Sequence, residues 1–325
     1  MGFPELSNYG CLPGKAGGSP SFTRPKISFG EKQMSVVMIT GSSSGFGLEA
    51  ALEFAENDDT VIATMRDTAR ADVLLARAAA EELAVQVKPL DLLKSDTFAA
   101  ATKEIVDEHG RIDVLVNNAG IHRGGALEDV SEEAFRNVME TNCIGPLLLT
   151  RTILPYMRRQ KQGLVIMMSS LSGIAGLPGD LPYAASKFAL EGATEALRHE
   201  VDRWGIRVAL VEAGLYKTGI MAHNLPQTSL LPGDYPTDSP YRTLIEWQLN
   251  NLRDRMPEAF DPVEVAKLFV TIANSDDSRL RWPADPVAGK VLATMLAQND
   301  SERDNFLRGV AGSDWWSQGI AAPPG

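Results

Sequence analysis

One tyrosine and one lysine have the spacing and chemistry that proton transfer requires. Tyr183 and Lys187 are four residues apart in a stretch predicted to be helical, so their side chains project from one face of the helix. A phenol has a pKa of about 10, and exchanging its proton near neutral pH requires roughly 4 kcal/mol of added stabilisation of the phenolate. An ammonium group about 4 Å away supplies about 4 kcal/mol at an effective dielectric constant of about 20. Lys187 can therefore tune Tyr183 as a general acid or base.

Hydroxyl and amide side chains precede this pair. Ser169 and Ser170 directly follow the apolar run 164–168, and Ser170 lies thirteen residues before Tyr183. Either hydroxyl could hold a substrate oxygen while the tyrosine exchanges its proton, and the chemistry alone does not choose between them. Asn142 falls inside a predicted helix, where an amide is mildly unfavourable, so its side chain is either merely solvated or functional.

A glycine-rich turn provides a second candidate site. The apolar run Val36–Thr40 leads directly into this turn and then into a helical stretch. Gly41 permits the tight turn, while Gly45 and Gly47 let the backbone approach a pyrophosphate where unpaired N–H groups and the helix dipole favour an anion. A plain strand–helix turn is the alternative. The predicted cofactor-binding residues of this turn are Gly41, Ser43, Ser44, Gly45, Phe46 and Gly47.

Two charged residues after the second predicted strand bear on the choice of cofactor. An acid at this place would bind the adenosine ribose, whereas a guanidinium pairs with a 2′-phosphate. Arg66 therefore favours NADP(H) over NAD(H). Asp67 could still face a ribose, and an ordinary surface role for Arg66 is the alternative.

Later strands end in further candidates for the adenosine side. Asp91, just after the third predicted strand, can accept a hydrogen bond from the adenine amino group. The fourth strand ends in the sequence NNAG, whose small residues allow close approach of the cofactor. The candidates here are Asn118, Ala119 and Gly120.

Regular alternation of strands and helices positions all of these residues. Strands are predicted at 36–40, 60–64, 84–88, 114–116, 164–168 and 208–212, and helices at 48–56, 70–83, 95–109, 132–159 and 183–204. Such alternation requires parallel pairing through right-handed crossovers. It predicts an α/β fold with a doubly wound, Rossmann-like parallel sheet in a single domain with helices on both faces, where ligands bind at the carboxyl ends of the strands. Beyond Thr218 the alternation is expected to stop, with two further helices at 262–274 and 285–297.

The composition excludes several other functions. The 325 residues carry a formal net charge of −11, which argues against nucleic acid or an anionic membrane as a partner. Two cysteines and four histidines without an HExxH pair give no basis for a disulfide framework or a metal site. No apolar run is long enough to span a membrane. We expect a cytoplasmic protein without a metal ion.

The motifs together resemble those of the short-chain dehydrogenase/reductase superfamily. TGSSSGFG at 40–47, NNAG at 117–120, Asn142, Ser170 and YAASK at 183–187 occur in the family's order over roughly residues 34–220. The TGxxxGxG spacing matches the single-domain branch. The sequences GLPGDLPYAASKFALEG and TMRD are similar to those of 17-beta-hydroxysteroid and retinol dehydrogenases.

The resemblance implies a role for each candidate residue. It implies that Tyr183 donates and accepts the proton, and that Ser170 rather than Ser169 binds the substrate oxygen. It also implies that Lys187 contacts the nicotinamide ribose and that Asn142 holds a water in a proton relay.

The motif PGxxxT of this family is present with one departure. Gly214 and Thr218 match it and would anchor the carboxamide of the cofactor, while Ala213 replaces the proline, which could loosen the turn.

The chain is expected to form one domain over residues 34–310. Residues 1–33 are predicted to be a disordered N-terminal extension, and 311–325 a C-terminal tail. By family analogy, residues 219–257 form a lid whose apolar side chains favour a hydrophobic substrate, unless they only fill a core beneath a long loop. His122 either borders this pocket or is solvated.

The function expected from these features is that of an NADP(H)-dependent oxidoreductase. It would interconvert a ketone or aldehyde and an alcohol by hydride transfer. The alternatives are a broad-specificity, detoxifying carbonyl reductase and a non-catalytic dinucleotide sensor, which usually lacks the tyrosine or lysine that this chain retains. The resemblance also implies a homodimer or homotetramer, formed through the helices that carry Asn142 and Tyr183. Trp315 and Trp316 would pack at a subunit interface or against the domain.

Overall fold

The computed structural model describes residues 34–218 and 235–321. These residues belong to one compact unit that begins at Met34. The predicted extension over 1–33, the first part of the predicted lid (219–234) and the end of the predicted tail (322–325) lie outside the described residues. Among the helices of the described residues, none combines the length and the apolar composition that a membrane crossing needs.

A seven-stranded parallel sheet forms the centre of the fold, in the order β3-β2-β1-β4-β5-β6-β7. The strands are β1 (Val36–Thr40), β2 (Thr60–Met65), β3 (Val85–Pro89), β4 (Val114–Asn117), β5 (Gly163–Met168), β6 (Ile206–Glu212) and β7 (Arg281–Pro283). The doubly wound sheet predicted from the alternation is confirmed. In doubly wound sheets the ligand-binding crevice forms where the chain reverses its direction of winding, which here is at the carboxyl ends of β1 and β4.

The prediction that the alternation of strands and helices stops after Thr218 is wrong, because α9 (Pro262–Asn274) and β7 continue it. Trp282 of β7 pairs with Val211 of β6 at the edge of the sheet. This strand has three residues, one charged and one a proline, so it lacks the apolar run that signals a buried strand.

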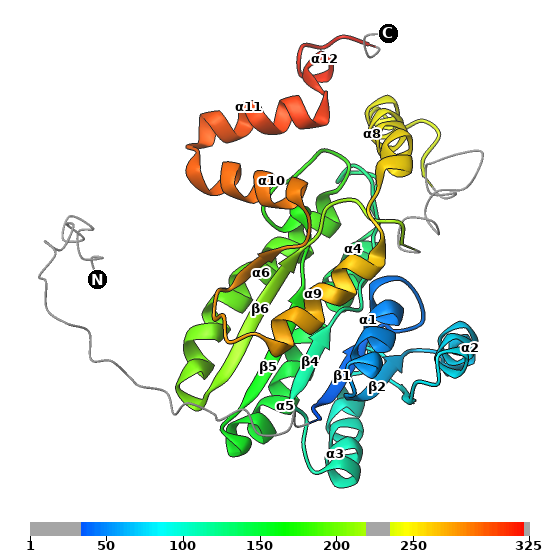
Figure 1. Cartoon of the computed structure of the whole chain (residues 1–325). Coiled ribbons are helices and arrows are strands. Elements are labelled where there is room, and N and C mark those ends of the chain that lie inside the picture. Colours follow the sequence, from blue (N-terminus) through cyan, green and yellow to red (C-terminus); the bar gives the residue numbers. More distant parts are fainter. Residues whose placement is uncertain (1–33, 219–234, 322–325) are drawn as a thin grey trace, which may run out of the picture. The chain divides into compact units, whose positions relative to one another are not determined.

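Helices lie between the strands in the chain and also follow the last strand. They are α1 (Gly45–Glu56), α2 (Asp72–Ala80), α3 (Phe98–His109), α4 (Glu132–Met139), α5 (Gly145–Gln160), α6 (Leu181–Val201), α8 (Arg242–Arg255), α9 (Pro262–Asn274), α10 (Pro286–Ala297), α11 (Asp300–Ala311) and α12 (Asp314–Ser317). Helices α1 and α9 lie side by side on one face (Figure 1), and α3, α5 and α6 cover the other.

Alternate residues of each central strand enter the cores on opposite faces. Val37 and Ile39 of β1 belong to the core under α1 and α9, whereas Val36 and Met38 belong to the core under α3, α5 and α6. A strand buried on both faces needs apolar residues at every position, which explains the continuous run VVMIT.

The helix predicted over 132–159 is interrupted by one π-helical turn. This turn, η4 (Glu140–Ile144), joins α4 to α5 without a break and carries Asn142. A π turn holds one extra residue, so it changes the direction in which its side chains project, and such turns are frequent at functional sites.

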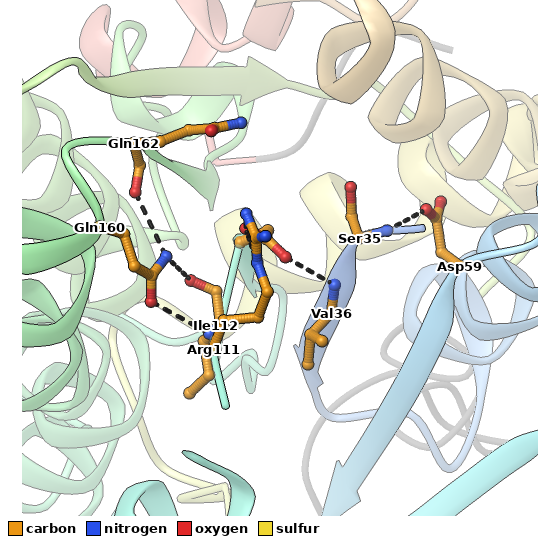
Figure 2. A network of polar contacts seen from close by, with 8 residues as sticks. Ser35, Val36, Asp59, Arg111, Ile112, Gln160 and Gln162 are labelled. Carbon is orange, nitrogen blue, oxygen red and sulfur yellow. Dashed lines mark hydrogen bonds and ion pairs between the residues drawn. The ribbon is translucent and has the colours of Figure 1, made fainter. Parts of the chain in front are cut away.

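A polar network ties the amino ends of β1 and β4 together at the opposite end of the sheet from the crevice. The N–H of Val36 donates to Asp113 at 2.9 Å. Figure 2 shows the side chain of Gln160 bonded to both backbone groups of Ile112. Arg111 pairs with the same Asp113 carboxylate. These bonds fix the starts of the two strands whose other ends border the crevice.

The C-terminal helices pack against α8. Trp315 is 4% exposed, and its ring meets the ring of Trp247 edge-on at 6.3 Å. Trp316 contacts the ring of Tyr241 at 6.4 Å. Trp315 therefore packs against the domain, which was one of the two alternatives predicted.

Candidate active site

The glycine turn has no room for side chains at its key positions. Gly41 has a φ of +72°, and a Cβ there would lie 2.8 Å from the Cα of Ala119. A Cβ on Gly47 would lie 2.4 Å from the carbonyl oxygen of Gly41. Helix α1 begins at Gly45, its N-cap Ser44 makes no side-chain capping bond, and its first turn has no acidic residue. The start of α1 therefore offers N–H groups to an anion.

The turn that follows β4 braces the glycine turn. The Asn118 amide donates to the carbonyl oxygens of Thr40 (2.9 Å) and Gly41 (3.3 Å). The Thr40 hydroxyl in return accepts from the N–H groups of Asn118 and Ala119, at 3.0 Å each. The Asn118 side chain is thus part of the scaffold of the predicted cofactor site.

The charged residues predicted to bind the adenosine end of the cofactor differ in their hydrogen bonds within the protein. Arg66 is exposed, and its guanidinium makes no hydrogen bond or ion pair within residues 34–218 and 235–321. Asp67 caps the 3-10 turn η2 (Thr68–Arg70) by accepting from the N–H of Ala69 at 3.0 Å. Asp91 is half-buried and accepts from the N–H of Leu93.

The segment after β6 reaches back to the glycine turn. The side chain of Thr218 lies 3.3 Å from the position of a Cβ on Gly45. The N–H of Gly214 donates to Asp285 (3.0 Å), whose other oxygen caps α10. The carbonyl of Ala213 accepts from Leu171 at 3.1 Å, so the turn that lacks the motif's proline is held by other bonds.

The Ser170 hydroxyl interacts with the phenol of Tyr183. Tyr183 is in the first turn of α6, and the Ser170 hydroxyl at the end of β5 lowers the pKa of its phenol. Burial has the larger effect and raises this pKa, and the charge of Asp180 raises it further. Ser169, the other candidate hydroxyl, is buried beside Glu191. The structure thus places Ser170 at the phenol.

Lys187 lies within reach of Tyr183, but its charge is engaged elsewhere. Its Nζ donates to the carbonyl of Met168 (2.7 Å) and lies 5.6 Å from the centre of the Tyr183 ring. Burial lowers the pKa of Lys187 to about 8, against the opposing charge of Glu191. Burial of the phenol has the largest effect on its pKa, which stays above the ordinary value, and the tuning role of Lys187 stays a prediction.

Asn142 is buried. The alternative prediction that its amide is merely solvated is therefore wrong. Its side chain accepts from the N–H of Ile121 and donates to the carbonyl of the same residue, both at 2.8 Å, and it also donates to the Ser186 hydroxyl. A Cβ on Gly120 would lie 3.4 Å from Asn142 Oδ1 and 3.8 Å from Lys187 Nζ. Asn142 and Lys187 therefore converge on Gly120.

His122 is also mostly buried rather than solvated. Its Nε2 lies 2.8 Å from Asp180 Oδ1, and the Ser172 hydroxyl donates to Asp180 Oδ2 at 2.6 Å. The ring of His122 contacts the ring of Tyr183 at 5.1 Å between centres.

An apolar cavity of about 510 Å³ lies beside the start of α6. Leu244 and Ile245 of α8 contribute to its wall, so part of the predicted lid forms this cavity. Tyr241 and Ser239 hold this region by hydrogen bonds to Glu128 and Asp129, at 2.6 Å each. The other lining residues are Gly125, Ala126, Leu127, Gly176, Leu177, Pro178, Gly179, Leu181, Ala184 and Ala185.

The sequence pattern of a known family, described as short chain dehydrogenase, matches residues 35–229. The chain belongs to this family of oxidoreductases. An uncharacterised oxidoreductase of Bacillus subtilis, YusZ, is 39% identical over 251 residues, which are 76% of this chain and 88% of that protein. Bovine retinol dehydrogenase 8 is 37% identical over 75% of this chain and 80% of its own. Human 17-beta-hydroxysteroid dehydrogenase type 1 is 34% identical over 76% of each.

Solved structures of short-chain dehydrogenases share the fold. One from Streptomyces avermitilis has a TM-score of 0.69 at 29% identity and covers 89% of this chain and 98% of its own. A metagenomic short-chain oxidoreductase in complex with NADP has a TM-score of 0.59 at 26% identity, over 77% of this chain and 94% of that one. The resemblance inferred from the motifs is therefore confirmed.

Sequence reasoning missed three residues of this short-chain dehydrogenase that hold the predicted ones in place. Asp180 and Ser172 flank Tyr183 and Ser170 in the chain, and Asp285 holds Gly214. Asp180 stands at the N-cap of α6, where an aspartate is common, so the presence of an aspartate there does not point to a catalytic role. Asp285, the first residue of the helix predicted over 285–297, is the N-cap of α10 and precedes Pro286, which is an ordinary pattern at the start of a helix.

Proposed function

We propose that this protein is an NADP(H)-dependent oxidoreductase that interconverts a hydrophobic ketone or aldehyde and the corresponding alcohol, with Tyr183 as the general acid and base. The observation that carries the proposal is the meeting of the Ser170 hydroxyl and the Tyr183 phenol, with Lys187 and Asn142 beside them. These groups lie at the carboxyl ends of the strands, where this fold binds its ligands.

The glycine turn fits a dinucleotide. A Cβ on Gly41 or Gly47 would collide with neighbouring atoms, and the start of α1 has neither a side-chain cap nor an acidic residue in its first turn, so it can accept an anion. Arg66 has the chemistry to pair with a 2′-phosphate, which favours NADP(H), and a family member of known structure carries NADP. We assign the remaining cofactor contacts to Ser43, Phe46, Asp91, Gly120 and Thr218. A bound nicotinamide supplies or accepts the hydride.

The residues of the chain manage the proton. In the reductive direction, the Ser170 hydroxyl donates a hydrogen bond to the substrate oxygen, and the Tyr183 phenol gives that oxygen its proton. The phenolate left behind is stabilised by the Lys187 ammonium. In the oxidative direction the phenolate takes the proton back from the alcohol. We assign to Asn142 the water of the proton relay.

The apolar cavity supports a hydrophobic substrate. Its walls are almost wholly aliphatic, and the chain's relatives include proteins named as retinol and hydroxysteroid dehydrogenases. Ser170, Tyr183 and Lys187 are not part of the lining. The cavity therefore suits the apolar body of a substrate rather than its reacting carbon.

A panel of carbonyl compounds tests the proposal. NADPH is first titrated to obtain its dissociation constant, and its oxidation is then followed by absorbance with aliphatic, aromatic, retinoid and steroid carbonyls. We expect turnover that rises with the hydrophobicity of the substrate. Equal turnover of all carbonyls would favour a broad carbonyl reductase, and tight NADPH binding without any turnover would favour a dinucleotide sensor.

We also propose a homodimer or homotetramer in the cytoplasm. Ile144, Leu181 and Phe188 are exposed on η4 and α6, the helical segments through which the family resemblance implies pairing. A low cysteine content suits a reducing compartment.

A further inference from the structure

Three polar side chains form a chain of contacts directly beside the phenol. Asp180 accepts from the Ser172 hydroxyl through Oδ2 (2.6 Å) and pairs with His122 Nε2 through Oδ1 (2.8 Å). The N–H of Ser172 in turn donates to the Ser170 hydroxyl oxygen at 3.2 Å. The contacts thus run from the proposed substrate-binding hydroxyl to the imidazole ring of His122.

Asp180 stands at the N-cap of α6 but does not cap this helix. An aspartate at an N-cap ordinarily accepts from the N–H groups of the first turn, yet here no side-chain capping bond is made. Both carboxylate oxygens are turned to His122 and Ser172 instead. The carboxylate thus forgoes a capping bond that contributes about 1 kcal/mol and instead contacts groups beside Tyr183.

His122 contacts the ring of Tyr183 itself. The ring centres are 5.1 Å apart and the planes are tilted by 59°. The His122 side chain is 14% exposed and that of Asp180 18%, so the pair is largely shielded from solvent. Both residues lie in loops beside the phenol. The N–H of Gly125 donates to the carbonyl of Gly179, and this bond holds the two loops together.

We propose that Asp180 and His122 are positioning residues for Tyr183: the pair holds the phenol ring and sets, through its charge balance, the pH at which the phenol gives up its proton. This inference rests on the proposed function. The groups that face the phenol are Ser170, Lys187 and this pair, and those that face the Asp180 carboxylate are His122, Ser172 and the phenol. Asp180 raises the pKa of Tyr183, and the contact of His122 Nε2 with Asp180 Oδ1 holds one oxygen of that carboxylate at 2.8 Å.

Two substitutions should shift the ionisation of Tyr183 in opposite directions. Asp180→Asn removes a negative charge beside the phenol at nearly constant shape, so the ionisation should move to lower pH by about one unit. His122→Phe keeps a ring against Tyr183 but leaves Asp180 without its nitrogen partner, so the ionisation should move to higher pH. The matched control is Glu132→Gln, which removes an exposed carboxylate paired with Arg136 on α4 and should leave the ionisation unchanged.

The ionisation is read without turnover by placing 3,5-difluorotyrosine at position 183 and following its fluorine resonance against pH. The fluorinated phenol is more acidic than that of tyrosine, so its ionisation midpoint lies at a lower pH, at which the protein remains folded. The pH profile of alcohol oxidation gives a second reading in the ordinary chain. Opposite shifts in both readings support the inference. A midpoint unmoved by Asp180→Asn, or shifts of the same sign in both variants, would overturn it. If no substrate is turned over, the proposed function fails, and the fluorine midpoints still decide the role of the pair.

Discussion

At the scale of single residues, burial works against the proton transfer proposed for Tyr183. The phenol loses hydration and faces the Asp180 carboxylate, and both effects raise its pKa. Lys187 meets the same environment, and its pKa falls to about 8. Positive charge brought to this site lowers the pKa of the phenol. The pKa values of both groups should therefore change when a charged ligand binds beside them.

The cofactor preference depends on one exposed side chain. Arg66→Ala removes the guanidinium proposed to pair with a 2′-phosphate, so we expect the dissociation constant of NADPH to rise about tenfold or more while that of NADH stays unchanged. Arg136→Ala, which removes an exposed charge on α4, should change neither. Fluorescence titration of both dinucleotides measures the effect. Native protein that binds NADH as tightly as NADPH would contradict the assignment.

Single residues were predictable where local geometry fixes their placement. Helical spacing alone puts Tyr183 and Lys187 on one face, and strand ends place Ser170 and the glycine turn at one edge of the sheet. Asp180 was not predictable in this way, because its partner His122 is 58 residues away in the chain. Only the tertiary approach of two loops reveals that pair.

At the scale of elements, a buried charged cluster joins α6 to the edge of the sheet. Arg281 of β7 pairs with Glu191 of α6 (3.0 Å) and lies 3.5 Å from Glu212, the last residue of β6. Glu212 is fully buried, and this burial together with the nearby charge of Glu191 raises its pKa to about 8. The same helix that carries Tyr183 and Lys187 is thereby anchored to β6 and β7.

The raised pKa of Glu212 should make stability depend on pH. Between its ordinary value of 4.5 and about 8, the folded state keeps a proton that the unfolded state releases, so stability falls as the pH rises through this range. Glu212→Gln cannot titrate. Urea unfolding at pH 5 to 8 should therefore show the variant gaining stability relative to the native chain as the pH rises. An exposed control, Glu132→Gln, should show no such trend, and equal trends in the two variants would refute the account of the cluster.

Elements were predictable where a long apolar or amphipathic run marks them. The six strands predicted from their apolar runs are all present, whereas β7 was missed because its three residues form an edge strand through one pairing with β6. The π turn at Asn142 was also missed, since a single extra residue leaves the helical pattern of the sequence almost unchanged.

At the scale of the whole molecule, α6 serves two surfaces. One face carries the proposed catalytic residues, and Phe188 on another is 42% exposed despite its apolar ring. If this face pairs subunits as proposed, Phe188→Glu should shift the mass measured by light scattering toward that of a single chain. Val73→Glu, which places the same charge at an exposed apolar residue of α2, should leave the assembly intact. An assembly unchanged by Phe188→Glu would exclude this face as the interface.

The doubly wound parallel sheet and the covering of both its faces followed from the alternation of elements, but the loops over the site did not. Residues 121–127 and 174–180 build both the apolar cavity and the contacts to Tyr183 from stretches with no regular pattern. Their arrangement depends on hydrogen bonds between the loops, and such bonds leave no periodic trace in a sequence.

The most direct test of the central claim is the rate of NADPH-dependent carbonyl reduction by Tyr183→Phe beside the native chain. The substitution removes one oxygen, which is the proposed proton donor, and leaves the glycine turn intact. We predict a loss of at least about 100-fold in kcat/KM with an NADPH dissociation constant close to the native value. A variant that reduces the same carbonyl at the native rate would contradict the account.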